Sequence, residues 1–245
     1  MADHALGRRQ PTDWKHVERY QLAGPLAATP ITVEDCLPLP YTLRPIYDQG
    51  QEGACVGYGW SWAMSILNTV DTYKLVTARY DPRWLYQQAQ LLDEWPETPP
   101  EEGTSVRAGG DVLRMMGHVR VRHGKDQPVS LAEGIAENRW ATSVDEMRAC
   151  ISKGVPVVIG VNWYTDFFEP EAIQKGHMQE FWIGHRALGR VEGGHCVCVY
   201  GASDDRQAFR IVNNWGKSWP LVWMPYDTMA RLIREDGEVA VITDK

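Results

Sequence analysis

The sequence has little of what a disulfide scaffold, a membrane span or a nucleic-acid-binding surface requires. Five cysteines among 245 residues are too few for a disulfide framework, and their odd number leaves at least one thiol unpaired. No apolar run approaches the length of about 18 residues that a transmembrane helix needs. Acidic residues outnumber basic ones by 32 to 25, which argues against a nucleic acid or an anionic membrane as partner.

The first residues also lack the apolar core and the small-residue cleavage site of a secretory signal peptide. We therefore expect a cytoplasmic, intracellular or virion-associated protein whose cysteines stay reduced. What the chain has in excess is tryptophan, with 11 Trp and 10 Tyr against 4 Phe. These rings bury large areas yet carry polar tips, so they suit clefts as well as cores.

Helical signals dominate the first part of the chain. Residues 1–40 are polar and contain several prolines, which predicts an extended arm lying over the surface. The stretch from Cys55 to about Leu75 is apolar on nearly every face and predicts a buried helix. Further helices are expected to begin at Asp81-Pro82 and to cover residues 107–116.

Strand signals dominate the second part. Ser143 and Glu146 form a capping-box pattern that predicts a short helix, with Gly154 as its stop. Strands are expected at residues 155–161, 195–200, 208–213 and 238–243, and residues 162–194 read as a long irregular segment. A helical part to about residue 142 and a β-rich part from about 143 predict an α+β fold with a cleft between two lobes.

Cys55 stands where the first buried helix is expected to begin, directly after Gly53 and Ala54. The free N–H groups and the macrodipole at a helix N-terminus favour the thiolate, which is the nucleophilic form of cysteine. The side-chain amide of Gln49, a short way upstream, could join the Cys55 backbone N–H in an oxyanion hole. A buried, inert thiol is the alternative for a cysteine considered alone.

A thiolate nucleophile also needs a partner that accepts and returns a proton. His195 follows two glycines and begins an expected strand, and Asn213 ends the next one. If a short loop joins these strands as neighbours, the Asn213 amide oxygen can hold one imidazole nitrogen and turn the other toward the sulfur. Trp215 could cover that hydrogen bond and keep water out.

Three ordered segments together resemble the papain-like cysteine peptidases of the C1 family. Residues 49–55 are similar to the family's Q-G-x-x-G-[SA]-C segment, and residues 193–195 to its G-G-H segment. Residues 212–219, VNNWGKSW, resemble its K-N-S-W-G-x-x-W segment. Each segment alone would be a weak signal, but their order and spacing make the resemblance specific.

The resemblance implies one peptidase domain over residues 41–245, with a helical left lobe, an antiparallel β-barrel-like right lobe and the active-site cleft between them. It implies that the backbone of Gly103 and Thr104 faces the substrate chain, with Trp215 also at the substrate. The implied catalytic set is the nucleophile Cys55, the general acid and base His195, the orienting residue Asn213 and the oxyanion donor Gln49.

The chain departs from the family pattern at several positions. Glu52 replaces a cysteine, so the family's nearby disulfide is absent, and Val56 replaces the Trp after the nucleophile. Only about 48 residues precede Gln49, fewer than the usual inhibitory propeptide plus a mature start. The chain therefore resembles the prosegment-lacking bacterial and phage branch of the family.

Other chemistry-bearing residues have simpler readings. Cys196 and Cys198 lie on the strand face opposite His195, so we expect core packing there and no metal. His177 and His185 read as loop histidines, and residues 107–125 as solvated surface. The aromatic residues within 163–182 are expected to pack in a loop or to line the substrate groove.

The acidic loop at residues 93–102 has two readings. It is either a solvated charge run or an element that biases a neighbouring subsite toward basic substrates.

We therefore expect a thiol hydrolase that cleaves peptide or isopeptide bonds in a peptide or protein substrate, without a cofactor. The Cys55 thiolate attacks the carbonyl, imidazolium His195 protonates the leaving amine, and water resolves the acyl-enzyme. Two alternatives stay open. One is a binding or structural module, such as a virion or assembly component, because nothing in the sequence visibly restrains a free protease. The other is acyl transfer to an amine by the same thioester.

Overall fold

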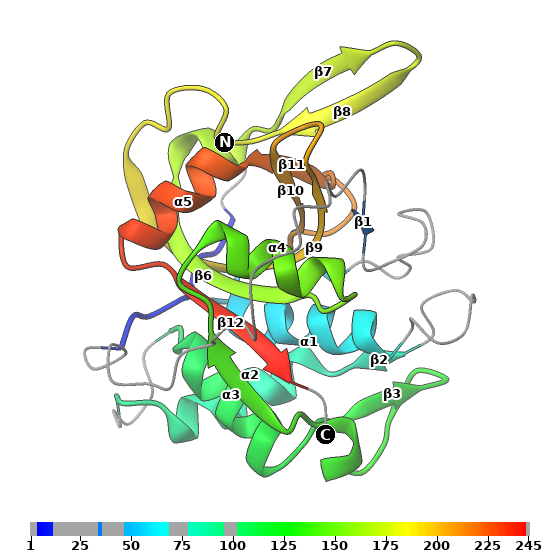
Figure 1. Ribbon diagram of the computed structural model, residues 1–245. Helices are drawn as coiled ribbons and strands as arrows, with labels where there is room; N and C mark the ends of the chain where they lie inside the picture. Colours follow the sequence, from blue (N-terminus) through cyan, green and yellow to red (C-terminus); the bar gives the residue numbers. More distant parts are fainter. Residues whose placement is uncertain (1–3, 12–33, 36–46, 69–77, 96–101, 244–245) are drawn as a thin grey trace.

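The helix α1 (Cys55–Leu67) is the centre of the fold, because its sequence leaves no polar face for solvent. Every residue from Cys55 to Ile66 is buried. In the computed structural model, which describes residues 4–11, 34–35, 47–68, 78–95 and 102–243, α1 contacts two other helices and the main sheet (Figure 1). The expected buried helix is confirmed, but it ends at Leu67; residues 69–77 lie outside the described residues.

Two short helices cover α1, and local capping explains where both begin. Asp81 accepts hydrogen bonds from the backbone N–H groups of Arg83 and Trp84, and Pro82 occupies the first turn of α2 (Pro82–Leu92). Ser105 caps α3 (Val106–Met115) in the same way. Both expected helices are confirmed.

The main sheet has nine strands among the described residues, and β9 lies at its middle (Figure 1). The order is β5-β12-β6-β9-β10-β11-β8-β7, and β1 pairs with β9; all pairs are antiparallel except β11 with β8. The strands are β1 (Glu34–Asp35), β5 (Glu137–Trp140), β6 (Val157–Tyr164), β7 (Glu171–Lys175), β8 (Met178–Trp182), β9 (Val191–Ser203), β10 (Ala208–Val212), β11 (Val222–Pro225) and β12 (Glu238–Thr243).

The remaining elements flank this sheet. The capping-box helix is α4 (Val144–Ser152), with Ser143 accepting a hydrogen bond from the Glu146 N–H. A last helix, α5 (Tyr226–Arg234), follows β11 directly. A small sheet is formed by β2 (Arg79–Tyr80), β3 (Arg120–Arg122) and β4 (Lys125–Asp126).

Two expectations about local structure are wrong. Residues 162–194 are not irregular, because β6 continues to Tyr164, and β7 and β8 form a hairpin. Residues 107–125 are not all solvated surface. His118 is fully buried, with its Nε2 3.0 Å from Ser61 Oγ and its Nδ1 accepting the Val119 N–H. The ring fills space between α1 and Tyr80, which stacks on it.

Candidate active site

Cys55 is the first residue of α1, so its side chain lies at the positive end of the helix dipole. The preceding Ala54 provides no side-chain cap, which leaves the first N–H groups of the helix available. Backbone N–H groups of Cys196, Gly7 and Val56 hydrogen-bond to the sulfur. Burial nevertheless dominates and raises the pKa of the Cys55 thiol to about 12, so the sulfur is a neutral thiol in this structure.

His195 lies on β9, and the antiparallel pairing of β9 with β10 brings Asn213 beside it. The Nε2 of His195 is 2.8 Å from the Asn213 Oδ1. Burial lowers the pKa of His195 to about 3, while the hydrogen bond to Asn213 opposes that shift. Among the described residues, Nδ1 has no hydrogen-bond partner, so this nitrogen is left for another group.

Asn214 ties the helix that carries Cys55 to the strand that carries His195. Its side-chain amide donates to the carbonyl oxygens of Cys55 and Cys196, at 3.3 and 2.9 Å. Its backbone carbonyl accepts the Gln49 N–H at 2.8 Å. Sequence reasoning missed Asn214, although its place between Asn213 and Trp215 was a usable signal.

Tryptophan rings enclose the His195 imidazole on two sides. Trp215 stacks on it with ring centroids 4.7 Å apart, and Trp163 meets it edge-on at 4.6 Å. Trp163 belongs to β6, and its role went unpredicted because the strand was expected to end two residues earlier. These rings exclude water from the bond between His195 and Asn213.

Gln49 lies beside Cys55 in the loop before α1, and the loop's Asp48 forms a bridge with Trp215. The side-chain nitrogen of Gln49 donates to the carbonyl oxygens of Glu52, at 2.9 Å, and Ala5, at 3.3 Å. The amide therefore donates to a carbonyl in its own loop and to one from the N-terminal part of the chain.

That other part of the chain is the N-terminal segment, defined here as residues 4–11, which lies across the site. Gly7 and Arg8 donate backbone hydrogen bonds to the Gly194 carbonyl, next to His195. His4 stacks on Trp215 with centroids 4.2 Å apart. The described part of the expected N-terminal arm is extended and lies over the residues around Cys55 and His195; residues 12–33 and 36–40 lie outside the described residues.

The backbone of Thr104 binds the N-terminal segment as an extended strand. Thr104 N donates to the Gly7 carbonyl at 3.0 Å, and the Thr104 carbonyl accepts the Arg9 N–H at 2.8 Å. Gly103 precedes it with φ of +97°, in the left-handed region. The two residues expected to face a substrate chain thus flank a chain segment, with Thr104 bonded to it in a parallel bridge.

The side chain of Arg8 is buried in an ion pair that sequence reasoning missed. Its Nε is 2.8 Å from Glu238 Oε2, and the exposed fractions of the two side chains are 3% and 0%. The partners lie at opposite ends of the chain, so no local pattern could have connected them.

The other candidates lie elsewhere or serve the fold. His177 is exposed, and His185 is 3.0 Å from Glu171. Part of the acidic loop, residues 96–101, lies outside the described residues. Within the described part of the chain, no group of three His, Cys, Asp or Glu side chains could hold a metal ion, and no helix is long and apolar enough to cross a membrane.

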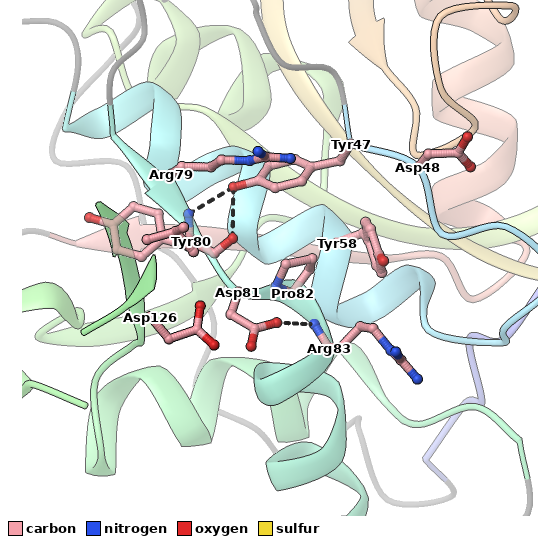
Figure 2. Close-up of a pocket in the computed structure, with 10 residues that line it drawn as sticks. Tyr47, Asp48, Tyr58, Arg79, Tyr80, Asp81, Pro82, Arg83 and Asp126 are labelled. Carbon is pink, nitrogen blue, oxygen red and sulfur yellow. Dashed lines mark hydrogen bonds between the residues drawn. The ribbon is translucent and has the colours of Figure 1, made fainter. Parts of the chain in front are cut away.

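A surface hollow of about 280 Å³ lies next to the site but does not contain it (Figure 2). Its lining includes Tyr47, Tyr58 and Arg83, but neither Cys55 nor His195. Figure 2 shows the Tyr47 hydroxyl bonded to the backbone of Tyr80, which makes this wall part of the scaffold that holds the loop before α1.

Comparison with solved structures decides the fold. Xylellain, a cysteine protease from Xylella fastidiosa, superposes with a TM-score of 0.72 over 99% of this chain and 97% of its own, at 19% identity. The chain has the papain-like cysteine protease fold. The proform of the ragweed pollen allergen Amb a 11, also a cysteine protease, superposes on this papain-like fold with a TM-score of 0.57, at 15% identity, over 89% of this chain and 66% of its own.

Sequence comparison points the same way. An uncharacterized peptidase C1-like protein of Acanthamoeba polyphaga mimivirus is 21% identical over 217 residues, which cover 78% of this chain and 67% of that protein. No family model matches the sequence. The expected α+β papain-like fold is confirmed; the division into lobes at residue 142 stays a prediction.

Proposed function

We propose that this protein is a cysteine peptidase that hydrolyses peptide bonds in peptide or protein substrates. Cys55 is the nucleophile, and His195 is the general acid and base. The observation that carries the proposal is the hydrogen bond between His195 and Asn213, with Trp215 stacked on the His195 ring. The residue that follows His195 on β9, Cys196, places its backbone N–H on the Cys55 sulfur.

The chemistry follows from what these groups do once a substrate replaces the N-terminal segment. The thiol gives its proton to the free Nδ1 of His195 and attacks the carbonyl, while the Asn213 oxygen stabilises the imidazolium. Gln49 then donates to the developing oxyanion instead of to the Ala5 carbonyl. Imidazolium His195 protonates the leaving amine, and water hydrolyses the thioester.

The N-terminal segment restrains this reaction in the resting protein. It places Gly7 on the sulfur and His4 on Trp215, and the resulting burial keeps both Cys55 and His195 neutral. The non-catalytic alternative was motivated by the lack of any restraint on a free protease. The segment supplies one, so that motivation is removed.

The segment also runs in the direction that protects it from cleavage. A leaving amine departs beside His195 and Trp215, so the acyl side of a substrate, which contains its earlier residues, lies toward Thr104. In the N-terminal segment the earlier residue His4 is at Trp215 and the later residue Arg9 is at Thr104. The segment therefore runs in the chain direction opposite to that of a substrate, so its peptide bonds are not positioned for cleavage.

The test is labelling with a thiol-directed epoxide together with hydrolysis of an unstructured protein substrate. In the Gly7→Val protein, whose segment is displaced, we expect a single adduct on Cys55 and substrate hydrolysis, both abolished by adding Cys55→Ser and both retained on adding the matched control Cys150→Ser. The Gly7→Val variant should react faster, because a Cβ at Gly7 would overlap the Gly53 backbone and displace the segment. Equal labelling of several thiols, or no hydrolysis by Gly7→Val, would contradict the proposal.

A further inference from the structure

The hairpin of β7 and β8 leaves one edge of the main sheet without a neighbouring strand. β7 is the last strand in the sheet order, and among the described residues it pairs with no strand other than β8. Figure 1 shows the hairpin projecting beyond the rest of the sheet, at the top of the view, so another chain can approach this edge. Such an edge offers a row of backbone donors and acceptors to a strand that can pair with it.

The register of the hairpin determines which backbone groups β7 presents at this edge. Lys175 and Met178 flank a two-residue turn, in which Gly176 has φ of +60°. In a hairpin of this kind the two flanking residues exchange both backbone hydrogen bonds, and bonded pairs then alternate along the ladder. Every second residue of β7, counted back from Lys175, therefore bonds to β8, whereas Ala172 and Gln174 direct their N–H and C=O groups outward.

The other neighbour of β8 agrees with this alternation. The N–H of Ile183, directly after β8, donates to the Trp223 carbonyl on β11 at 3.0 Å. The preceding residue, Trp182, therefore directs its backbone groups toward β7, where it lies opposite Glu171. The outward direction of the Ala172 groups thus follows from both sides of the hairpin.

The side chains of β7 complement those of a second β7 strand that runs antiparallel to it. With a twofold axis at Ile173, Glu171 of each copy lies opposite Lys175 of the other. Ala172 then lies opposite Gln174, so their outward N–H and C=O groups pair. Ile173 and the two charged residues occupy non-hydrogen-bonded positions, where opposing side chains come closest. Pairs of β-branched residues and pairs of opposite charge are both favourable across strands.

Neighbouring registers do not match these groups. An axis at Ala172 would place Gln174 opposite Pro170, which has no N–H to donate. An axis at Gln174 would place Ala172 opposite Gly176, which lies in the turn. An axis between two residues would set outward-facing residues opposite inward-facing ones. The pairing centred on Ile173 is therefore the register that β7 favours.

The two charged side chains of β7 are held along the hairpin and stay accessible. The Glu171 carboxylate is 3.0 Å from the His185 Nε2, and the Lys175 Nζ is 3.6 Å from the Glu180 carboxylate. The exposed fractions of the Glu171 and Lys175 side chains are 38% and 48%. Because exposed ion pairs contribute little free energy, these charges select the partner and its register. The backbone hydrogen bonds and Ile173 hold the strands together.

We propose that this protein self-associates as a twofold dimer through β7, which joins the main sheets of two copies into one continuous sheet. The inference is independent of the proposed function. An interface built on one five-residue strand is small, and small interfaces are weak and transient. The dimer therefore forms at high protein concentration.

Sedimentation equilibrium of the full-length protein, from micromolar to millimolar concentration, tests the proposal. We expect the weight-average mass to rise from 27.8 kDa toward twice that value. Ala172→Pro removes an outward N–H and leaves the bonds to β8 in place, so this variant should stay monomeric. A mass of one chain at every concentration would overturn the inference, and so would association of a folded Ala172→Pro protein equal to that of the unaltered one.

Charge reversal tests the register and identifies the partner as a second copy. Glu171→Lys and Lys175→Glu each place like charges opposite one another at both ends of the interface, so each should weaken association about 10-fold. An equimolar mixture of the two variants restores both opposite-charge pairs in a mixed dimer, which local damage to either hairpin could not do. Lys125→Glu, the same change on the exposed strand β4, is the matched control and should associate normally. A mixture that associates no more strongly than either variant alone would overturn the inference.

Discussion

At the scale of single residues, burial decides the protonation state of the site more than hydrogen bonding does. The hydrogen bond with Asn213 favours the imidazolium form of His195, and backbone N–H groups favour the thiolate form of Cys55. Both side chains are nevertheless neutral. Desolvation by burial therefore outweighs the hydrogen bonds that favour the charged forms of both side chains.

Gln49 offers a test of oxyanion stabilisation. Gln49→Ala in the Gly7→Val background should lower kcat by about 10²- to 10³-fold with little change in KM, because the amide acts on charge that develops in the transition state. Steady-state kinetics on one peptide measures this, with Gln51→Ala as the neighbouring control. A change confined to KM would indicate that Gln49 binds substrate and does not stabilise the oxyanion.

His118 provides a test of buried ionisation. Burial lowers its pKa to about 3, so in acid the unfolded chain binds a proton that the folded protein does not. The free energy of unfolding should therefore fall as pH drops below about 6.5, by up to about 1.4 kcal/mol per pH unit for this group. Burial of His195 adds a contribution of the same sign.

Urea unfolding between pH 7 and pH 4 measures that slope. We expect it to be shallower in His118→Gln than in the unaltered protein, and unchanged in His177→Gln, which alters an exposed side chain. Identical slopes in all three proteins would show that His118 is not held neutral by burial.

At the scale of elements, the sequence predicted where helices begin but not where strands end. Asp81-Pro82 and Ser143 with Glu146 predicted α2 and α4, because a capping hydrogen bond is local to a few residues. The hairpin of β7 and β8 was missed. It is polar and largely exposed, so it lacks the alternation of apolar residues that marks a half-buried strand.

The cap of α4 gives the prediction at this scale. Ser143→Ala should lower the free energy of unfolding by about 1 kcal/mol, since the Glu146 N–H loses its acceptor. Thermal or urea unfolding measures the change, with Ser152→Ala at the other end of the helix as control. Equal effects of the two substitutions would argue against a specific capping contribution.

At the scale of the whole molecule, the N-terminal segment joins the two halves of the site. It bonds to Thr104 before α3, to Gly194 on β9 and to Glu238 on β12. Removing it should therefore change the chemistry of Cys55 as well as its access.

The pH dependence of Cys55 alkylation tests this. In the unaltered protein the rate should rise only as pH approaches about 12, the pKa of the covered thiol. In Gly7→Val the profile should move to lower pH, because the sulfur regains water and the desolvation that raises its pKa is reduced. Mass spectrometry of the Cys55 peptide separates this thiol from the others; superimposable profiles would show that the segment does not control its ionisation.

The amino-acid sequence was enough to predict the fold class, the buried helix that begins at Cys55 and the adjacency of His195 and Asn213. These depend on local patterns: a small-residue turn before an apolar helix, and two strands joined by a short loop. The position of residues 4–11 across the site, and the ion pair of Arg8 with Glu238, became visible only in the three-dimensional packing. Such a contact depends on the packing of β6, β9 and β12, which leaves room for the Arg8 side chain, and no pattern along the chain encodes that space.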